Sequence, residues 1–241
     1  MGITQILDPF YISLPSETFR KVPSVGQFCW VPVPHLDPIP RILDIERADP
    51  TEHYATKFSI RNMQNKDFRK KPRLPIKMLS LRETEELIIC RTKKRPGIII
   101  SADFTIFDDV SQELRRLGRR HLQEDNIIIV PLYEAETVEH KGGFPPIMAA
   151  RIRTLMYNQF FFCPKTDLGL INDSIARLDR IQVIKPIYPT YEPKQFALSL
   201  ETLPILMEML RSLFGAEEGK DLRALRQLLI EFLPDEAKII K

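Results

Sequence analysis

Residues 126–133 read NIIIVPLY, and this run is the strongest indicator of fold in the sequence. Isoleucine and valine follow one another and are ended by Pro131, which cannot donate a hydrogen bond to a ladder. A short apolar, β-branched run of this kind predicts a buried strand. We therefore expect a protein with a β-sheet core.

Other runs add strands to this core. Residues 26–33, GQFCWVPV, predict a first strand that is closed by the prolines after it. Residues 87–91 and 97–104 predict two more strands, joined by a basic turn, TKKRP, at 92–96. Strand-like composition also occurs in IMAARIRTL (147–155) and NQFFFCP (158–164).

The run SIARLDRIQVI, residues 174–184, predicts a last strand that carries two opposite charges. The period of two places Arg177 and Asp179 on one face, and that face continues into Ile181 and Val183. Judged alone, the pair is an ion pair that ties down the end of a strand. The alternative is that the two side chains act on a proton.

Helical spacing appears in three places. In residues 108–125, Val110, Leu114, Leu117 and Leu122 recur at helical intervals, with arginines on the other faces. Residues 199–215 and 221–236 show the same period and predict two C-terminal helices. The expected fold is therefore mainly β, of the α+β class, with a closed barrel or curled sheet.

Composition allows a sizeable core but gives little on function. The chain has 241 residues, 44% of them hydrophobic, and a formal charge of +3, too mild to indicate nucleic acid by itself.

Positive charge gathers over 61–95, inside a proline-rich stretch that suggests an insertion. We expect one domain over 22–215, with an insertion at about 36–86 and an inserted helix at about 109–124. Residues 216–241 would form a helical extension.

Cysteine and histidine usage indicates neither a disulfide framework nor a metal site. Cys29, Cys90 and Cys163 lie far apart, which favours a reducing, cytoplasmic setting. No apolar stretch reaches the length of a membrane span, so no membrane association is expected. The histidines lack the paired spacing of metal ligands; they are His35, His53, His121 and His140.

Four runs, in this order along the chain, resemble the MazF/PemK (Kid-like) family of bacterial toxins. They are GQFCWVPV, KRPGIIIS, NIIIVPLY and GLINDSIARLDRIQVI. The resemblance implies an SH3-like barrel of the MazF/PemK/CcdB type that forms a homodimer. It also implies cleavage of single-stranded RNA without a metal or cofactor, growth inhibition, and neutralisation by an antitoxin protein.

The same resemblance assigns three catalytic positions. Arg95 falls on the arginine of the family's Arg-Pro motif, and its planar fork suits a phosphate. Arg177 and Asp179 fall on the Arg-x-Asp pair, in which the acid is the proposed base and the arginine the proposed acid or charge stabiliser. The implied reaction is attack by the ribose 2′-hydroxyl, which leaves 2′,3′-cyclic phosphate and 5′-hydroxyl ends.

RNA-binding residues are predicted from residue type. Where the family has a small hydroxyl residue after Val-Pro, this sequence has Leu132, Tyr133 and Glu134. Tyr133 could stack on a base or merely cap the core. Candidate phosphate contacts are Lys93, Lys94, Arg115 and Arg119, although a solubilising face is the commoner fate of such charge runs.

Two other functions stay open on the sequence alone. The same barrel could be a non-catalytic module that binds RNA, DNA or a protein, with the insertion as its recognition surface. Alternatively, residues 34–92 and the C-terminal helices could form a permanent assembly interface in an accessory protein.

Overall fold

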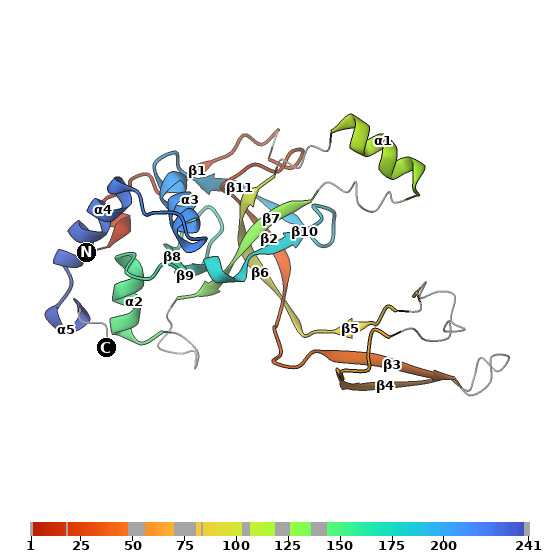
Figure 1. The fold of residues 1–241 in the computed structure, drawn as a ribbon. Helices are drawn as coiled ribbons and strands as arrows, with labels where there is room; N and C mark the ends of the chain where they lie inside the picture. Colours follow the sequence, from red (N-terminus) through yellow and green to blue (C-terminus); the bar gives the residue numbers. More distant parts are fainter. Residues whose placement is uncertain are drawn as a thin grey trace. The chain divides into compact units, whose positions relative to one another are not determined.

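The computed structural model describes residues 2–17, 19–47, 56–69, 81–82, 84–102, 107–118, 126–135 and 144–238 (Figure 1). The chain divides into two compact units. The first unit contains Met1–Pro32 and Lys94–Lys241, and the second contains Val33–Lys93. The predicted insertion at 36–86 falls within the second unit. Each unit is described by itself.

The larger sheet has eight strands, mostly short, in the order β1-β11-β2-β6-β7-β9-β8, with β10 also paired to β7. The pairs β1–β11, β11–β2, β6–β7, β7–β9, β7–β10 and β8–β9 are antiparallel. The bounds are β1 Tyr11–Ser13, β2 Gln27–Pro34, β6 Thr92–Ser101, β7 Ile127–Glu134, β8 Phe160–Cys163, β9 Ser174–Arg177, β10 Gln182–Ile184 and β11 Glu192–Leu198.

Strand β7 is the buried strand predicted from NIIIVPLY, and it organises the sheet. It pairs with β6 along one edge and with β9 and β10 along the other. Ile129 and Val130 are fully buried although they point to opposite faces. Both faces of β7 are therefore covered, which is why its sequence is a continuous apolar run rather than an alternating one.

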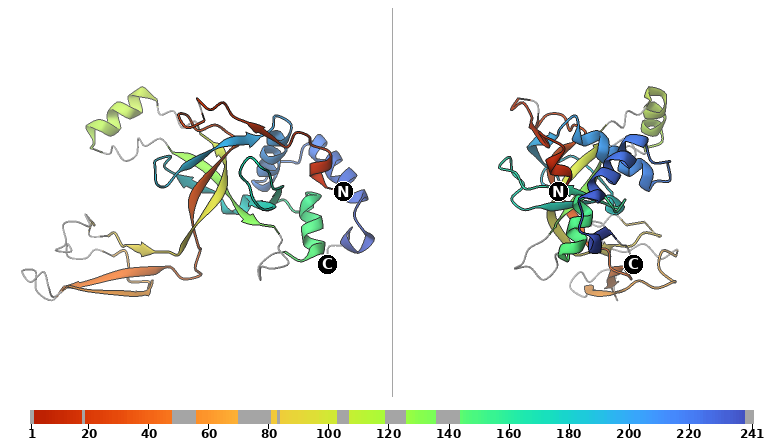
Figure 2. Two further views of the ribbon diagram at one scale, coloured as in Figure 1. Left: turned by 180° about the vertical axis from the view of Figure 1, so that it is seen from behind. Right: turned by 90° about the vertical axis from the view of Figure 1, so that its left-hand side faces the viewer.

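The fold is mainly β, of the α+β class, built on a strongly curled antiparallel half-barrel sheet with a smaller sheet and C-terminal helices. Figure 2 shows the curl of the larger sheet from behind and from the side. One sheet face packs on a core in which the rings of Phe28 and Phe196 are stacked 4.5 Å apart. Helix α3, Thr202–Leu213, covers this core with Leu206 and Met209.

Helix α4, Lys220–Glu231, adds Leu222 and Leu229 to the same core cluster and is followed by α5, Asp235–Lys238. Helices are present where the sequence predicts them, but the single helix predicted over 221–236 is interrupted between Glu231 and Asp235. Helix α3 ends before Gly215, whose φ of +92° suits glycine in the left-handed region.

Two predicted strand features are wrong. Residues 147–155, predicted as strand-like, lie mostly in helix α2, Pro146–Arg153. Pro146 occupies the first helical position, where proline is favoured, and the alanines that follow are strong helix formers. The supposed basic turn at 92–96 is extended and forms the first half of β6, while residues 88–89 of the other predicted strand form β5 in the smaller sheet, so the two do not form a hairpin.

The predicted inserted helix is α1, Asp108–Arg116. It ends at Arg116, two residues before Gly118, whose φ is +67°, and residues 119–125 of the prediction lie outside the described residues. None of the residues of α1 is buried. Val110, within the helix, is 45% exposed, and Leu117, directly after it, is 49% exposed. Its apolar stripe is therefore not part of the core.

The second unit carries a three-stranded antiparallel sheet in the order β4-β3-β5. Its strands are β3 Arg41–Arg47, β4 Thr56–Asn62 and β5 Ile88–Ile89. Arg61 on β4 bonds Asp44 across the ladder at 2.7 Å and Asp67 at 2.8 and 2.9 Å. This network of charges joins the strand pair to the loop that follows it.

Candidate functional site

Three neighbouring strands of the first unit bring together two arginines around one tyrosine. Gly97 on β6 pairs with Pro131 on β7, and two residues farther along these antiparallel strands are Arg95 and Tyr133. The guanidinium carbon of Arg95 lies 4.4 Å from the centre of the Tyr133 ring. Arg177, at the end of β9, lies 5.9 Å from the same ring centre.

Asp179 completes the cluster through Arg177. The Nε and Nη2 atoms of Arg177 donate to the two carboxylate oxygens of Asp179 at 2.7 and 2.6 Å. This is a bidentate pair, in which both hydrogen bonds carry charge on donor and acceptor. Arg95, Arg177 and Asp179, which lie far apart in sequence, therefore meet at one site with Tyr133 between the arginines.

The local backbone differs from the predicted strand. Residues 174–184 do not form one strand, because β9 ends at Arg177 and a 3₁₀ turn, Leu178–Arg180, separates it from β10. Both strands pair with β7, but in registers that differ by the residues of the turn. Asp179 thus reaches Arg177 from the turn and not by strand alternation. The predicted contact is present, and the predicted geometry is wrong.

The ion pair shifts both pKa values in the direction that keeps the pair charged. Hydrogen bonds from Arg177 hold the pKa of the Asp179 carboxyl below its ordinary value, with burial opposing this. The bonds to Asp179 in turn raise the pKa of the Arg177 guanidinium. A carboxylate with a lowered pKa is a weak base at neutral pH while the pair is intact.

The site is open to solvent. The side chains of Arg177 and Asp179 are 24% and 35% exposed, and Arg95 and Tyr133 are half-buried. Two guanidinium groups against one carboxylate leave a net positive charge beside an accessible aromatic ring. Such a surface suits a phosphate next to a planar base.

Phe160 belongs to the site, although the sequence did not single it out. It pairs directly with Arg177 across β8 and β9, and its ring centre lies 5.1 Å from the Arg177 guanidinium carbon. Phe160 also contacts the rings of Phe144 and Tyr157. The signal in the sequence was the aromatic run at 160–162, which the pairing of β8 with β9 brings next to Arg177.

Among the remaining predicted RNA contacts, Lys93 lies two residues before Arg95 on β6, so strand alternation places the two on the same face. Lys94 alternates with Arg95 on β6, so it points to the opposite face, where it bonds Glu192. Lys93 is exposed and belongs to the second unit, and Arg115 is exposed on α1. Arg119 lies outside the described residues.

Metal ligands do not gather within the described residues: no group of three His, Cys, Asp or Glu side chains is placed to hold an ion. His35 lies 3.6 Å from Asp37 in the second unit. The other histidines, His53, His121 and His140, lie outside the described residues. Cys29 and Cys163 are buried and Cys90 is exposed, and all three are free thiols.

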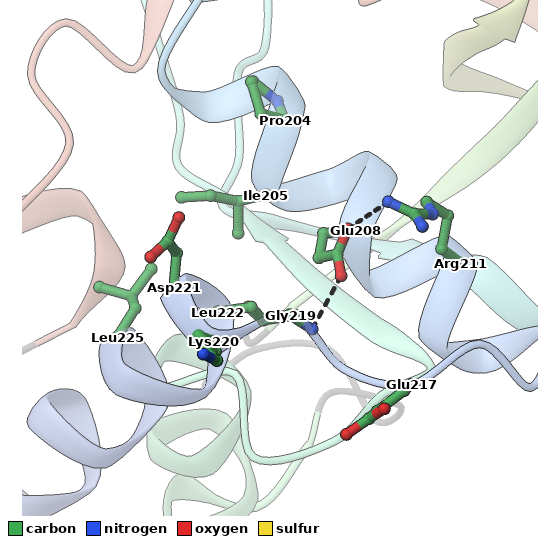
Figure 3. A pocket seen from close by; sticks show the side chains of 10 residues that line it. All are labelled: Pro204, Ile205, Glu208, Arg211, Glu217, Gly219, Lys220, Asp221, Leu222 and Leu225. Carbon is green, nitrogen blue, oxygen red and sulfur yellow. Dashed lines mark hydrogen bonds and ion pairs between the residues drawn. The ribbon is translucent and has the colours of Figure 1, made fainter.

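A separate groove of about 450 Å³ lies between α3 and α4 (Figure 3). Its lining includes Ile205 and Leu225, and its rim includes Glu208, which accepts a hydrogen bond from the Gly219 amide at 2.9 Å. None of the predicted site residues lines this groove.

In the part of the chain that the structure describes, no helix has the length and apolar character needed to cross a bilayer.

The chain matches no protein-family model, and it matches no curated protein. Fold and site together define an α+β protein in which a curled sheet carries an exposed arginine–tyrosine–arginine cluster.

Proposed function

We propose that this protein is a metal-independent RNA endonuclease of the MazF/PemK type, acting on single-stranded RNA at Arg95, Tyr133, Arg177 and Asp179. The observation that carries the proposal is that both arginines contact one tyrosine ring while Asp179 bonds one of them. The curled sheet is compatible with the SH3-like barrel of that family.

In the proposed reaction, the scissile phosphate lies against Arg95 and Arg177, whose charges stabilise the pentavalent phosphorus. Asp179 takes the proton of the ribose 2′-hydroxyl, and the 2′-oxygen forms a bond to phosphorus. The bond from phosphorus to the 5′-oxygen breaks, and that oxygen takes a proton from water. Tyr133 stacks on a neighbouring base.

The test is to incubate the purified protein with a long single-stranded RNA in EDTA and to map the new ends. The proposal expects 5′-hydroxyl and 2′,3′-cyclic phosphate ends. Arg95→Ala, Arg177→Ala and Asp179→Asn should remove them, whereas Arg211→Ala, an exposed arginine on α3, should not. RNA that stays intact with the wild-type protein contradicts the proposal.

One observation favours a second function, a non-catalytic RNA-binding module. Both oxygens of Asp179 are engaged by Arg177, which weakens the carboxylate as a base. If this pair is permanent, the site binds a phosphate and a base without cleaving. Salt-sensitive RNA binding without new ends would identify this function.

The toxin proposal also includes a homodimer, a cytoplasmic site of action and an acidic antitoxin protein. The net positive charge of the exposed site is compatible with an acidic partner segment that covers it. A short neighbouring reading frame for an acidic protein, whose product abolishes RNA cleavage, would support this part of the proposal.

A further inference from the structure

One of the two edges of Arg177 that suit a phosphate is already occupied. Guanidinium groups bind phosphates through two parallel N–H donors, and Nε with Nη2 forms such a donor pair. In this structure both atoms donate to Asp179, at 2.7 and 2.6 Å. Within the described residues, Nη1 is the donor of Arg177 that carries no hydrogen bond. A phosphate can therefore use the Nε–Nη2 edge of Arg177 only if the carboxylate leaves it, whereas the opposite edge, formed by Nη1 and the second N–H of Nη2, carries no hydrogen bond among the described residues.

Asp179 has a second cation beside it. The Nε atom of Arg180 lies 4.0 Å from the same Oδ2 atom that bonds Arg177. Asp179 and Arg180 both sit on the short 3₁₀ turn, and their side chains are 35% and 39% exposed. A small side-chain rotation would move the carboxylate from Arg177 toward Arg180 without burying an unpaired charge.

Arg177 itself would stay in place during this exchange. Its guanidinium contacts the ring of Phe160 at 5.1 Å and that of Tyr133 at 5.9 Å. Phe160 is 8% exposed and is part of the main core. Arg177 is thus held by two aromatic rings in addition to its bonds with Asp179.

We propose that Asp179 acts as an internal competitor for phosphate: it occupies the Arg177 fork in the free protein, and a phosphodiester of bound RNA displaces it toward Arg180. This inference rests on the proposed function, because it concerns the same RNA site. Displacement breaks the two hydrogen bonds from Arg177 to the carboxylate, so the substrate itself removes the bidentate partner that weakens the base.

The test measures binding of a 2′-O-methyl RNA, which cannot be cleaved through its 2′-oxygen. Asp179→Asn keeps the shape of the side chain and removes its charge, so the fork is held less strongly. Because an exposed ion pair is worth up to about 1 kcal/mol, we expect binding to become about two- to fivefold tighter. If the asparagine side chain at position 179 distorts the 3₁₀ turn, RNA binding by Asp179→Ser gives a second measure of the effect of removing the charge.

The matched control is Glu134→Gln. Glu134 is exposed and follows Tyr133 on β7, so the substitution removes one negative charge near the site without touching Arg177. A second control introduces Asp179→Asn into an Arg177→Gln background, where there is no fork to release. Thermal unfolding of each variant checks that it is folded.

The inference is supported if Asp179→Asn tightens binding more than Glu134→Gln does and if this gain disappears in the Arg177→Gln background. Equal gains for the two acids mean that only net charge matters, which overturns the inference and leaves the proposed function intact. If neither the wild-type protein nor any variant binds the RNA, the proposed function fails together with the inference.

Discussion

The Arg95 guanidinium carbon lies 4.4 Å from the centre of the Tyr133 ring, and the two side chains come from adjacent strands, β6 and β7. A cation over an aromatic face at this distance is held in orientation as well as in place. The pair therefore presents the fork of Arg95 in a defined direction beside a half-buried ring.

Two substitutions of Arg95 should show how far RNA binding and cleavage depend on its charge and how far on its planar shape. Arg95→Ala should lower RNA cleavage about 100-fold or more, since loss of one donor to a developing oxyanion has a cost of that order. Arg95→Lys should restore RNA binding in part but little cleavage, because lysine is a point charge without a fork. Both variants should unfold near the wild-type temperature, since Arg95 is half-buried and outside the core cluster. Unchanged cleavage by Arg95→Ala would contradict the assignment.

Substitutions at Tyr133 should distinguish the ring from the hydroxyl. Tyr133→Phe keeps the surface on which Arg95 and Arg177 lie, so RNA affinity should change little. Tyr133→Ala removes that surface and a stacking partner, which should weaken binding of a short single-stranded RNA about tenfold or more. Fluorescence anisotropy measures both. If the phenylalanine variant binds as weakly as the alanine variant, the hydroxyl contacts the RNA and the stacking role is wrong.

Glu192 should titrate far below an ordinary glutamate. Bonds from Lys194 and Lys94 lower its pKa from 4.5 to about 2. Because the folded-state pKa is lowered, the interaction contributes stability above about pH 4.5 and is lost as the pH falls through about 2. The side chain is 41% exposed, so solvent screening limits the contribution to less than about 1 kcal/mol.

A carbon-detected NMR titration of the Glu192 carboxyl group tests this directly. The expected midpoint lies near 2 in the wild-type protein and moves up in Lys94→Ala, which removes one of the two lysines. An ordinary midpoint near 4.5 in the wild-type protein would show that the lysines do not hold the carboxylate in solution.

Arg61 should stabilise the second unit locally. It bonds Asp44 and Asp67, and the side chain of Asp67 is only 1% exposed. Arg61→Ala removes the guanidinium from the buried Asp67 carboxylate, which keeps its bond from the Gln64 amide, and this should lower the stability of the second unit. Hydrogen exchange should become faster in β3 and β4 and stay unchanged in β7. Lys57→Ala, on the same strand, is the control, and Asp67→Asn in the Arg61→Ala background should recover part of the loss.

Much of the core could be predicted because local composition dictates it. The run at 126–133 is apolar on both faces, so it can be stable only as a covered strand, and β7 is covered on both faces. The C-terminal helices follow from an apolar repeat that needs a core to pack on, and α3 and α4 provide that packing. Residues 147–155 were predicted wrongly because apolar content outweighed the helix propensity of alanine.

The candidate site shows most clearly which features could be predicted from the sequence and which depend on the tertiary structure. The sequence by itself determined which charged groups are available and that β7 is buried, since residue type and period govern both. It did not determine that Arg177 and Asp179 meet through a 3₁₀ turn, or that Phe160 supports Arg177. Strand pairing decided these contacts, because which residues lie opposite each other depends on registers set by the whole sheet and not by any one segment.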